Sequence, residues 1–423
     1  MNKHIEKISE GICMKKYISI ILVSAMLFSC VACKEGQATE QTSETTTAST
    51  TEIITTTEEP TPMGTGVLSE LKGDSGNFFV NEDPKYADLI SVVEFKTDLY
   101  GFEGSIILAT DDEIILFGGP NSAMTIENKP VDPYTTYDIA SCSKTFTAVA
   151  VFQLIEEGKI SLDDTLDKFF PDYEDGKKIT IYNLLHMQSG IKDYYVNPNK
   201  FFANVSEEDM EAFLERFFHD EVGDEEFLQN LFASELDFEP GTKEFYSNTN
   251  YDLLAIIVEL VSGEKFCDYL QKNVFDVCGL EHTTSMVVGN ETSIPKNYEM
   301  MIEMGMVDET GRYMAVCRER GSGGIHTCVY DLLSFDRALF GGKLVSDTSF
   351  SEMKNFDMGY GCGLIPYGKT AVGHSGFNAS FTTQNVVIET EEFGKVYFIA
   401  MTANIQSQSG LDTTLEAVID ELT

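Results

Sequence analysis

A serine and a lysine three residues apart, Ser141 and Lys144, are spaced in a way that suits covalent chemistry. They open an apolar stretch, 145–157, whose composition predicts a helix. Residues three apart on a helix share one face, so the lysine amine would lie beside the serine hydroxyl. The backbone N–H of a serine at a helix start also lies where partial positive charge collects. The pattern therefore predicts a serine made nucleophilic by a neighbouring amine.

The same spacing occurs elsewhere, so the choice of Ser141 depends on its surroundings. The other serines with a lysine three residues later are Ser69, Ser189, Ser262, Ser293 and Ser351. Ser189 and Ser262 are each followed by glycine, which disfavours a helix that would carry the lysine. Ser293 has a proline before its lysine, and no Tyr-x-Asn pattern follows Ser351. Ser141 is therefore the serine that we expect to act as the nucleophile.

Two later patterns hold further groups that acyl transfer needs. Tyr246 and Asn248, in Tyr-Ser-Asn, follow a Pro-Gly turn and precede an apolar helical stretch. His374-Ser375-Gly376 lies in the C-terminal part, where strands are predicted. A serine nucleophile needs a base, for which lysine, tyrosine and histidine are candidates, and two N–H donors for the oxyanion. The candidate catalytic residues are therefore Ser141, Lys144, Tyr246, Asn248 and His374.

The three patterns, in this order, resemble those of the class C β-lactamase and penicillin-binding-protein-like serine hydrolases. That family carries S-x-x-K, Y-x-N and K/H-[ST]-G, a set related to the motifs of class A β-lactamases. The resemblance covers about residues 90–422 and includes weaker landmarks. These are 160–164, Phe170-Pro171, Leu184-Leu185, Ser189-Gly190, Pro240-Gly241, Gly279-Leu280 and Ser322-Gly323-Gly324. The resemblance implies a β-lactamase/transpeptidase-like α/β fold of the α+β type and catalysis through an acyl-enzyme.

The resemblance also assigns the groups that bind the substrate carbonyl. Ser141 Oγ would attack this carbonyl, and the backbone N–H of Ser141 would supply half of the oxyanion hole. The N–H of Phe377 would supply the other half. Ser375 and Gly376 would lie along the substrate, because glycine lets a substrate backbone approach the strand edge closely.

Two assignments of the base stay open in the sequence. In the first, the ammonium group of Lys144 lowers the pKa of Tyr246, which then takes the serine proton. In the second, neutral Lys144 is itself the base. In either case Asn248 would bind Lys144 or the amide of the substrate.

His374 stands where β-lactamases and many carboxypeptidases of the family carry a lysine that helps recognise the substrate carboxylate. Histidine there is similar to the esterase and D-aminopeptidase branches, and unperturbed histidine is mostly neutral at pH 7. We expect a small-molecule or peptide substrate, with a D-amino-acid peptide of cell-wall type first, cleaved by a peptidase or carboxypeptidase. The alternatives are a small-ester esterase, a weak β-lactamase, and a catalytically inactive binding lipoprotein of the same fold.

The composition narrows the possible partners and cofactors. Lysine and arginine number 29 against 69 aspartates and glutamates, which gives a formal net charge of −40. Such an anionic surface argues against nucleic acid or acidic lipid as a partner. The six cysteines after residue 34 form no Cys-x-x-Cys pair, and the remaining histidines show no ligand spacing. We therefore expect neither a metal nor a cofactor.

The N-terminal residues predict export. Residues 1–32 have the order of a signal peptide, with two lysines before an apolar run that is too short to span a bilayer. A cleavage box like that of bacterial lipoproteins ends at Cys33, the expected lipidated residue, with Cys30 as the alternative. Residues 33–66, rich in Thr, Ser and Glu, predict a disordered tether. We expect a cell-surface protein anchored by lipid alone to the outer face of the cytoplasmic membrane, or else a fully secreted one.

The remaining residues, 67–423, predict one hydrolase domain. Strands are predicted at 104–109, 113–117, 361–365, 370–374, 380–389 and 395–403. Helices are predicted at 83–100, 141–157, 180–186, 206–218, 224–233, 252–261, 266–275, 330–340 and 411–422. Strands at both ends with helices between them predict one antiparallel sheet from 90–140 and 355–423, with flanking helices and a mostly helical insertion at about 160–340.

Overall fold

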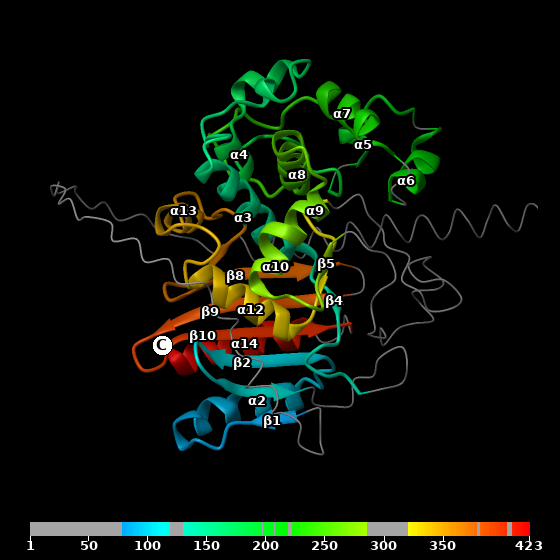
Figure 1. Ribbon diagram of the computed structural model, residues 1–423. Coiled ribbons are helices and arrows are strands. Elements are labelled where there is room, and N and C mark those ends of the chain that lie inside the picture. Colours follow the sequence, from blue (N-terminus) through cyan, green and yellow to red (C-terminus); the bar gives the residue numbers. More distant parts are fainter. Residues whose placement is uncertain are drawn as a thin grey trace, which may run out of the picture.

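A seven-stranded sheet forms the centre of the computed structural model, and each neighbouring pair of strands is antiparallel (Figure 1). The structure describes residues 78–118, 130–196, 198–206, 208–218, 222–285, 320–378, 381–403 and 408–423. In spatial order the strands are β1 (Phe78–Val80), β3 (Ile114–Gly118), β2 (Ser105–Thr110), β10 (Gly394–Thr402), β9 (Thr382–Thr390), β8 (Ala371–Phe377) and β7 (Ile365–Tyr367). Because β2 pairs with β10, segments from both ends of the described chain build one sheet.

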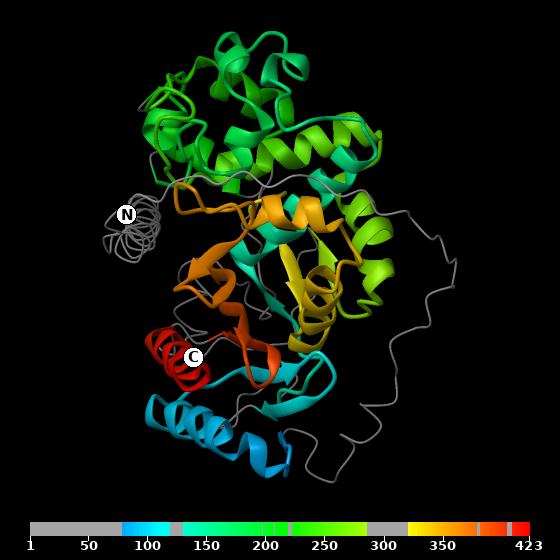
Figure 2. The same cartoon turned by 90° about the vertical axis from the view of Figure 1, so that its left-hand side faces the viewer.

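Helices cover both faces of this sheet, which explains why most residues on both faces of its inner strands are buried. On one face, α2 (Ala87–Leu99) and α14 (Gln408–Leu422) pack together, as Figure 2 shows. Ile106 and Leu108 of β2 belong to the core on this side, and Ile107 and Ala109 belong to the core on the other. There α12 (Val329–Phe340) packs against β10 and β2. The predicted fold class, an antiparallel sheet with flanking helices and a helical insertion, is confirmed.

A mostly helical part lies beyond one edge of the sheet, at the top of Figure 1. Besides α12, the helices and helical turns between residues 140 and 353 are η3 (Ala140–Cys142), α3 (Ser143–Glu156), η4 (Leu166–Lys168), η5 (Glu174–Lys178), α4 (Ile181–Leu185), α5 (Pro198–Phe201), α6 (Met210–Phe218), α7 (Asp224–Ala233), α8 (Asn248–Ser262), α9 (Phe266–Leu270), η6 (Gln271–Phe275), α10 (Asp276–Cys278) and α13 (Asp347–Met353). A further turn, η2 (Pro84–Tyr86), precedes α2. The helix predicted at 252–261 begins earlier, at Asn248, so this residue lies in its first turn.

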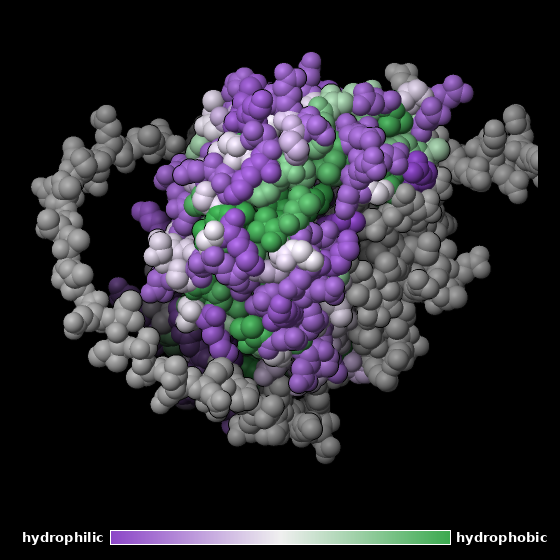
Figure 3. Space-filling view, turned by 45° about the horizontal axis from the view of Figure 1, so that its top comes forward, coloured by the Kyte–Doolittle hydropathy of each residue, from purple (hydrophilic) through white to green (hydrophobic). Residues whose placement is uncertain are grey.

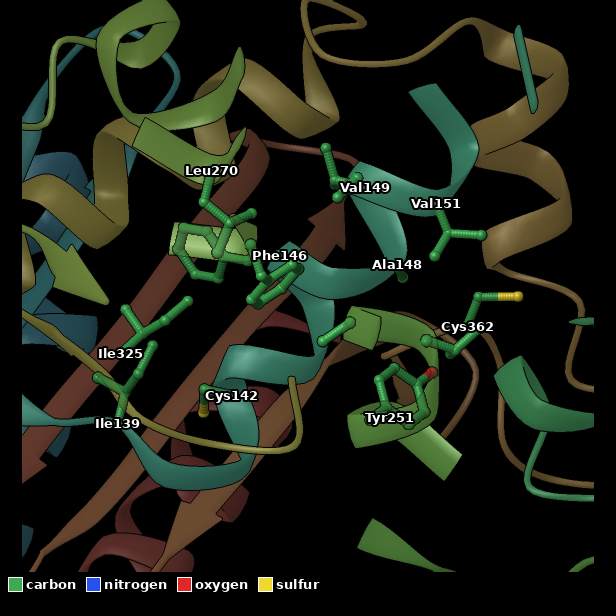
Figure 4. Packing of buried hydrophobic residues seen from close by; sticks show 14 of the residues in the cluster. Ile139, Cys142, Phe146, Ala148, Val149, Val151, Tyr251, Leu270, Ile325 and Cys362 are labelled. Atoms are coloured by element: carbon green, nitrogen blue, oxygen red, sulfur yellow. The ribbon is translucent and has the colours of Figure 1, made fainter. Parts of the chain in front are cut away.

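Helix α3 runs through the core and joins the helical part to the sheet. Its side chains are buried on nearly all sides, as expected for a helix without a polar face. Phe146 stacks on Phe335 of α12 with the ring centroids 3.7 Å apart. In Figure 4, Ile139 and Ile325 lie together on one side of α3, and Tyr251 lies on the other. The start of α3 is therefore held from two sides by packed side chains.

A second, three-stranded sheet fixes the chain just before Ser141. It consists of β4 (Tyr137–Asp138), β6 (Ile325–Thr327) and β5 (Thr284–Ser285). The sequence placed 90–140 in the main sheet, but β4 pairs with β6 instead. The N–H of Ile139 extends this pairing by donating to the carbonyl of Ile325 at 3.0 Å. The turn that carries Ser141 thus follows a strand of this second sheet and not of the main sheet.

The strand predicted at 361–365 is wrong except at its last residue, because residues 361–364 form a loop. Gly363 has a φ of +68°, and a Cβ there would lie 2.6 Å from the carbonyl oxygen of Lys144. Only glycine adopts this backbone and approaches so closely without strain. The loop packs against the start of α3, and the strand β7 begins only at Ile365.

Figure 3 shows the molecule with its helical part turned forward. Apolar residues form a strip on this face, bordered by hydrophilic residues. Hydrophilic residues cover much of the rest of this face. No helix in the described part of the chain is both long and apolar enough to cross a membrane.

Candidate active site

Ser141 lies in η3, the turn that opens α3, and the backbone around it is unusual. Ala140, directly before it, has a φ of +44°, a conformation that is uncommon outside glycine. Gly376 of β8 lies so close to this turn that a Cβ there would be 2.0 Å from the carbonyl oxygen of Ile139. The serine is therefore presented by a strained turn that packs directly against the end of a strand.

Asp138 joins the two backbone segments that are expected to form the oxyanion hole. Its Oδ1 accepts the N–H of Ala140 at 2.7 Å, and its Oδ2 accepts Nδ2–H of Asn378 at 2.8 Å. Ala140 precedes Ser141, and Asn378 follows Phe377. One buried carboxylate therefore fixes the spacing between the segments that carry the two predicted N–H donors.

Ser141 Oγ lies within hydrogen-bond distance of both candidate bases. Lys144 Nζ donates to it at 3.0 Å, and the hydroxyl of Tyr246 donates to it at 2.9 Å. The serine side chain is nearly buried, with 9% of its surface exposed. The structure thus brings together three side chains that the sequence placed in one site, and two of them are able to exchange a proton with the serine.

Lys144 is fully buried and hydrogen-bonds to three oxygen atoms. Besides Ser141 Oγ, its Nζ donates to Asn248 Oδ1 at 2.8 Å and to the carbonyl of Ser322 at 2.6 Å. Nζ also lies 4.9 Å from the centroid of the Tyr246 ring, an attractive position for an ammonium group. These contacts satisfy the three donors of an ammonium group.

The orientation of Asn248 is set by a buried carboxylate. Asp193 Oδ2 accepts the backbone N–H of Asn248 at 2.6 Å and its Nδ2–H at 2.9 Å. Because Nδ2 faces this carboxylate, Oδ1 must face Lys144. Burial raises the pKa of Asp193, whereas backbone N–H groups and the charge of Lys144 act in the opposite direction. Asn248 therefore serves as an acceptor for Lys144.

His374 is buried and electrically neutral. Its Nδ1 lies 2.6 Å from the carbonyl of Ser375, which only accepts, so Nδ1 carries the proton. Its Nε2 lies 3.0 Å from the hydroxyl of Tyr360, which must donate to it. Burial, and then the positive charge of Lys144, lower the pKa of His374 to about 3. At neutral pH this position carries no cation for a substrate carboxylate.

Three of the residues that shape the site were not predicted from the sequence. These are Asp138, Asp193 and Tyr360. Asp193 binds the predicted Asn248 and Tyr360 binds the predicted His374, whereas Asp138 binds Ala140 and Asn378, the neighbours of the predicted Ser141 and Phe377. The glycines around Tyr360, at Gly359, Gly361 and Gly363, were the one local signal of a close backbone approach.

Other predicted features fall outside the described residues. Cys30 and Cys33, the 1–32 signal peptide and the 33–66 tether precede the first described residue, Phe78. Within the described ranges, no group of three or more His, Cys, Asp or Glu side chains is placed to hold a metal ion. The cysteines described there have free thiols and are Cys142, Cys267, Cys278, Cys328 and Cys362.

Comparison with known proteins identifies the family. The family model described as Beta-lactamase matches residues 100–421. Penicillin-binding protein 4* of Bacillus subtilis (strain 168) is 26% identical over 328 residues, which span 71% of this chain and 69% of the relative.

Solved structures share the fold. The penicillin binding protein from Bacillus halodurans has a TM-score of 0.60 at 21% identity, over 77% of this chain and 99% of that chain. The D-amino acid amidase from Ochrobactrum anthropi SV3 has a TM-score of 0.58 at 20% identity, over 79% and 99%. The family match covers most of the chain, and these structures share its architecture. The chain therefore belongs to the beta-lactamase family, the serine hydrolases related to class C β-lactamases and penicillin-binding proteins.

Proposed function

We propose that the chain cleaves an amide or ester bond through an acyl-enzyme on Ser141. The observation that carries the proposal is that the nearly buried Ser141 hydrogen-bonds through Oγ to both Lys144 and Tyr246. In the first step the phenolate of Tyr246 takes the serine proton while Oγ bonds to the substrate carbonyl carbon. The N–H groups of Ser141 and Phe377 would stabilise the oxyanion that develops.

The second half of the reaction uses the same groups in reverse. Tyr246 returns its proton to the nitrogen or oxygen of the leaving group as the scissile bond breaks, which leaves the acyl group on Ser141. A water molecule then loses a proton to Tyr246, attacks the ester and releases the acid, and Ser141 regains its proton. Lys144 as an ammonium group would favour the phenolate form of Tyr246 throughout, since an adjacent positive charge stabilises an anion.

We propose a D-amino-acid peptide or amide of cell-wall type as the substrate. The name of the D-amino acid amidase that shares the fold and the name of the relative in Bacillus subtilis support this class. The neutral His374 favours a substrate that is bound through its carbonyl and amide groups, because no cation stands at this strand position to bind a free carboxylate. A small ester is the second candidate on the same ground.

We further propose that the protein is exported and lipidated at Cys33, with the described domain carried on the 33–66 tether. The lysine-flanked apolar run and the cysteine that follows it support this proposal. Metabolic labelling with an alkynyl fatty acid tests it. Labelling that Cys33→Ala abolishes and Cys30→Ala spares is expected, and labelling that survives Cys33→Ala contradicts the assignment.

The catalytic proposal is tested by covalent probes of the purified protein. A fluorophosphonate and a fluorescent penicillin are each incubated with the wild type, with Ser141→Ala and with Ser351→Ala. Ser351 is a matched control because it has the same Ser-x-x-Lys spacing but lies exposed on α13. Labelling by either probe that is lost only in Ser141→Ala is expected. The absence of labelling that depends on Ser141 contradicts the proposal and favours a binding protein of the same fold.

The substrate class is tested with paired substrates. Release of ammonia from D-phenylalanine amide and of D-alanine from a D-alanyl-D-alanine peptide is compared with release from the L isomers and with hydrolysis of p-nitrophenyl acetate. We expect turnover of the D-amide with a preference over the L-amide. Turnover of the ester alone would favour the esterase alternative, and fast turnover of the penicillin would favour a β-lactamase.

A further inference from the structure

Two buried carboxylates are linked to the amine of Lys144 through residues that accept its hydrogen bonds. The Nζ of Lys144 is buried, and the oxygens of Ser141, Asn248 and Ser322 that accept its hydrogen bonds are uncharged. An ammonium group removed from water is costly unless opposite charge stands close by. The two carboxylates stand one residue further out, and each binds a residue that binds Lys144.

The first carboxylate acts through Asn248. Asp193 accepts both N–H groups of Asn248 and also the backbone N–H groups of Tyr195, at 2.7 Å, and Val196, at 2.9 Å. The opposite end of the Asn248 amide, Oδ1, binds Lys144. The amide dipole therefore points from the carboxylate to the ammonium group, so that the negative charge strengthens the acceptor.

The second carboxylate acts through Ser322. Asp252 Oδ1 accepts the backbone N–H of Ser322 at 3.1 Å, and Asp252 Oδ2 accepts the hydroxyl of Tyr194 at 2.6 Å. The carbonyl of Ser322 binds Lys144 at 2.6 Å. Asp252 lies in α8, whereas Asp193 lies in the loop after α4, so two separate elements supply negative charge to one amine.

Three other titratable groups near Lys144, namely Tyr251, Cys142 and His374, are neutral at pH 7. The rings of Tyr246 and Tyr251 face Nζ at 4.9 and 5.9 Å, and burial raises the pKa of Tyr251. Burial likewise raises the pKa of Cys142, and His374 on β8 is neutral at pH 7. Burial raises the pKa values of Asp193 and Asp252, and the hydrogen bonds that they accept and the charge of Lys144 act in the opposite direction.

We propose that Asp193 and Asp252 are positioning residues that hold Lys144 in its ammonium form and thereby assign the proton transfer to Tyr246. This inference rests on the proposed function of Ser141. It selects between the two assignments that the sequence left open, since a lysine held as an ammonium group has no lone pair with which to act as the base.

Asp252→Asn is the decisive variant because it removes charge and keeps the hydrogen bonds. The amide oxygen still accepts from Ser322, and the amide nitrogen donates to the hydroxyl of Tyr194, which accepts as well as it donates. Asp331→Asn is the matched control. Asp331 is equally buried and accepts the backbone N–H of His282 and the hydroxyl of Thr283, whereas Asp252 accepts the hydroxyl of Tyr194 and two backbone N–H groups, those of Ser322 and, at 3.4 Å, Gly321.

The rate of Ser141 labelling by the fluorophosphonate is measured from pH 5 to 10 in all three proteins. In Asp252→Asn we expect both limbs of the pH profile to move to lower pH by about one unit and the maximal rate to fall about tenfold. Asp331→Asn should leave both limbs in place. A merely structural role for Asp252 would lower the rate without moving the limbs. Limbs that stay in place, or a maximum that does not fall, would overturn the inference.

The result separates this inference from the proposed function. If the wild type is not labelled at Ser141, the proposed function fails. If the wild type is labelled and the profile of Asp252→Asn is unmoved, only the role of the carboxylates fails. Should Asp252→Asn not fold, Asp193→Asn is measured by the same criteria, with circular dichroism to show that it is folded.

Discussion

Replacing Gly376 with alanine should separate the two halves of the proposed oxyanion hole. The added Cβ would lie 2.0 Å from the carbonyl oxygen of Ile139, and real contacts of this kind are essentially never shorter than 3.0 Å. The end of β8 and the turn before Ser141 must therefore move apart by at least about 1 Å to relieve the overlap. Phe377 follows Gly376 directly, so its N–H would move with the strand.

A displacement of this size predicts a large loss of rate. Misplacing a reacting group by about 1 Å costs up to about 10²-fold, and losing one oxyanion donor costs about 10²–10³-fold. We therefore expect acylation of Ser141 by the fluorophosphonate to slow by about 10²-fold in Gly376→Ala. Overpacking should also lower the free energy of unfolding by about 1–3 kcal/mol.

Gly373→Ala separates the catalytic effect from the loss of stability. Gly373 lies on the same strand, and its Cβ would also be 2.0 Å from a carbonyl oxygen, that of Asn385 on β9. We expect a similar loss of unfolding free energy, by urea denaturation, but a loss of acylation rate below about tenfold. Equal rate losses in the two variants, or a Gly376→Ala rate within about threefold of the wild type, would refute the reasoning.

Three further predictions concern stability. Burial lowers the pKa of His374 from 6.5 to about 3, so the unfolded state binds more protons than the folded state between these pH values. The free energy of unfolding should therefore fall as the pH is lowered from about 6.5, by up to about 1.4 kcal/mol per pH unit. In urea titrations, His374→Gln should flatten this slope. Burial raises the pKa of Asp336 from 3.8 to about 8, so the carboxyl lowers the free energy of unfolding as the pH rises through that range. Asp336→Asn should therefore raise the free energy of unfolding more at pH 8 than at pH 4. An equal gain at both pH values would contradict the raised pKa of Asp336. Phe146→Ala, which removes the ring stacked on Phe335, should cost about 3–5 kcal/mol of unfolding free energy, and a cost below about 1 kcal/mol would show that the core of α3 is loosely packed.

The main elements of the fold were predictable because their patterns are local. The strands at 104–109 and 113–117 and the helices around 83–100 and 252–261 were predicted close to their observed bounds, since apolar runs bounded by turns specify them. The loop at 361–364 was misread as a strand because its conformation depends on glycines that pack against α3, a contact that no local pattern encodes. The short strand β1 was missed for a similar reason, since three residues are too few to show a period.

The residues that bind Ser141 directly were predictable, and the residues that orient them were not. Lys144 lies one helical turn from the serine, so its position follows from spacing alone. Tyr246 and Asn248 were found only through their order along the chain, which the resemblance to a family supplied. Asp193 carries no such mark in the sequence, because its role follows from the buried hydrogen bonds it makes to Asn248 in the folded chain.

The neutral state of His374 follows first from its burial and then from the charge of Lys144, which both lower the pKa of the imidazole. Two imidazole nitrogens, one donating to Ser375 and one accepting from Tyr360, leave His374 no site for a second proton unless a hydrogen bond breaks. The adjacent charge of Lys144 opposes that protonation further. Among the described residues of the site, Lys144 is the buried group that can carry a positive charge, and in the proposal above Asp193 and Asp252 balance that charge. Such a site has little positive charge left to offer a substrate carboxylate, which favours substrates that present an uncharged amide or ester at this strand.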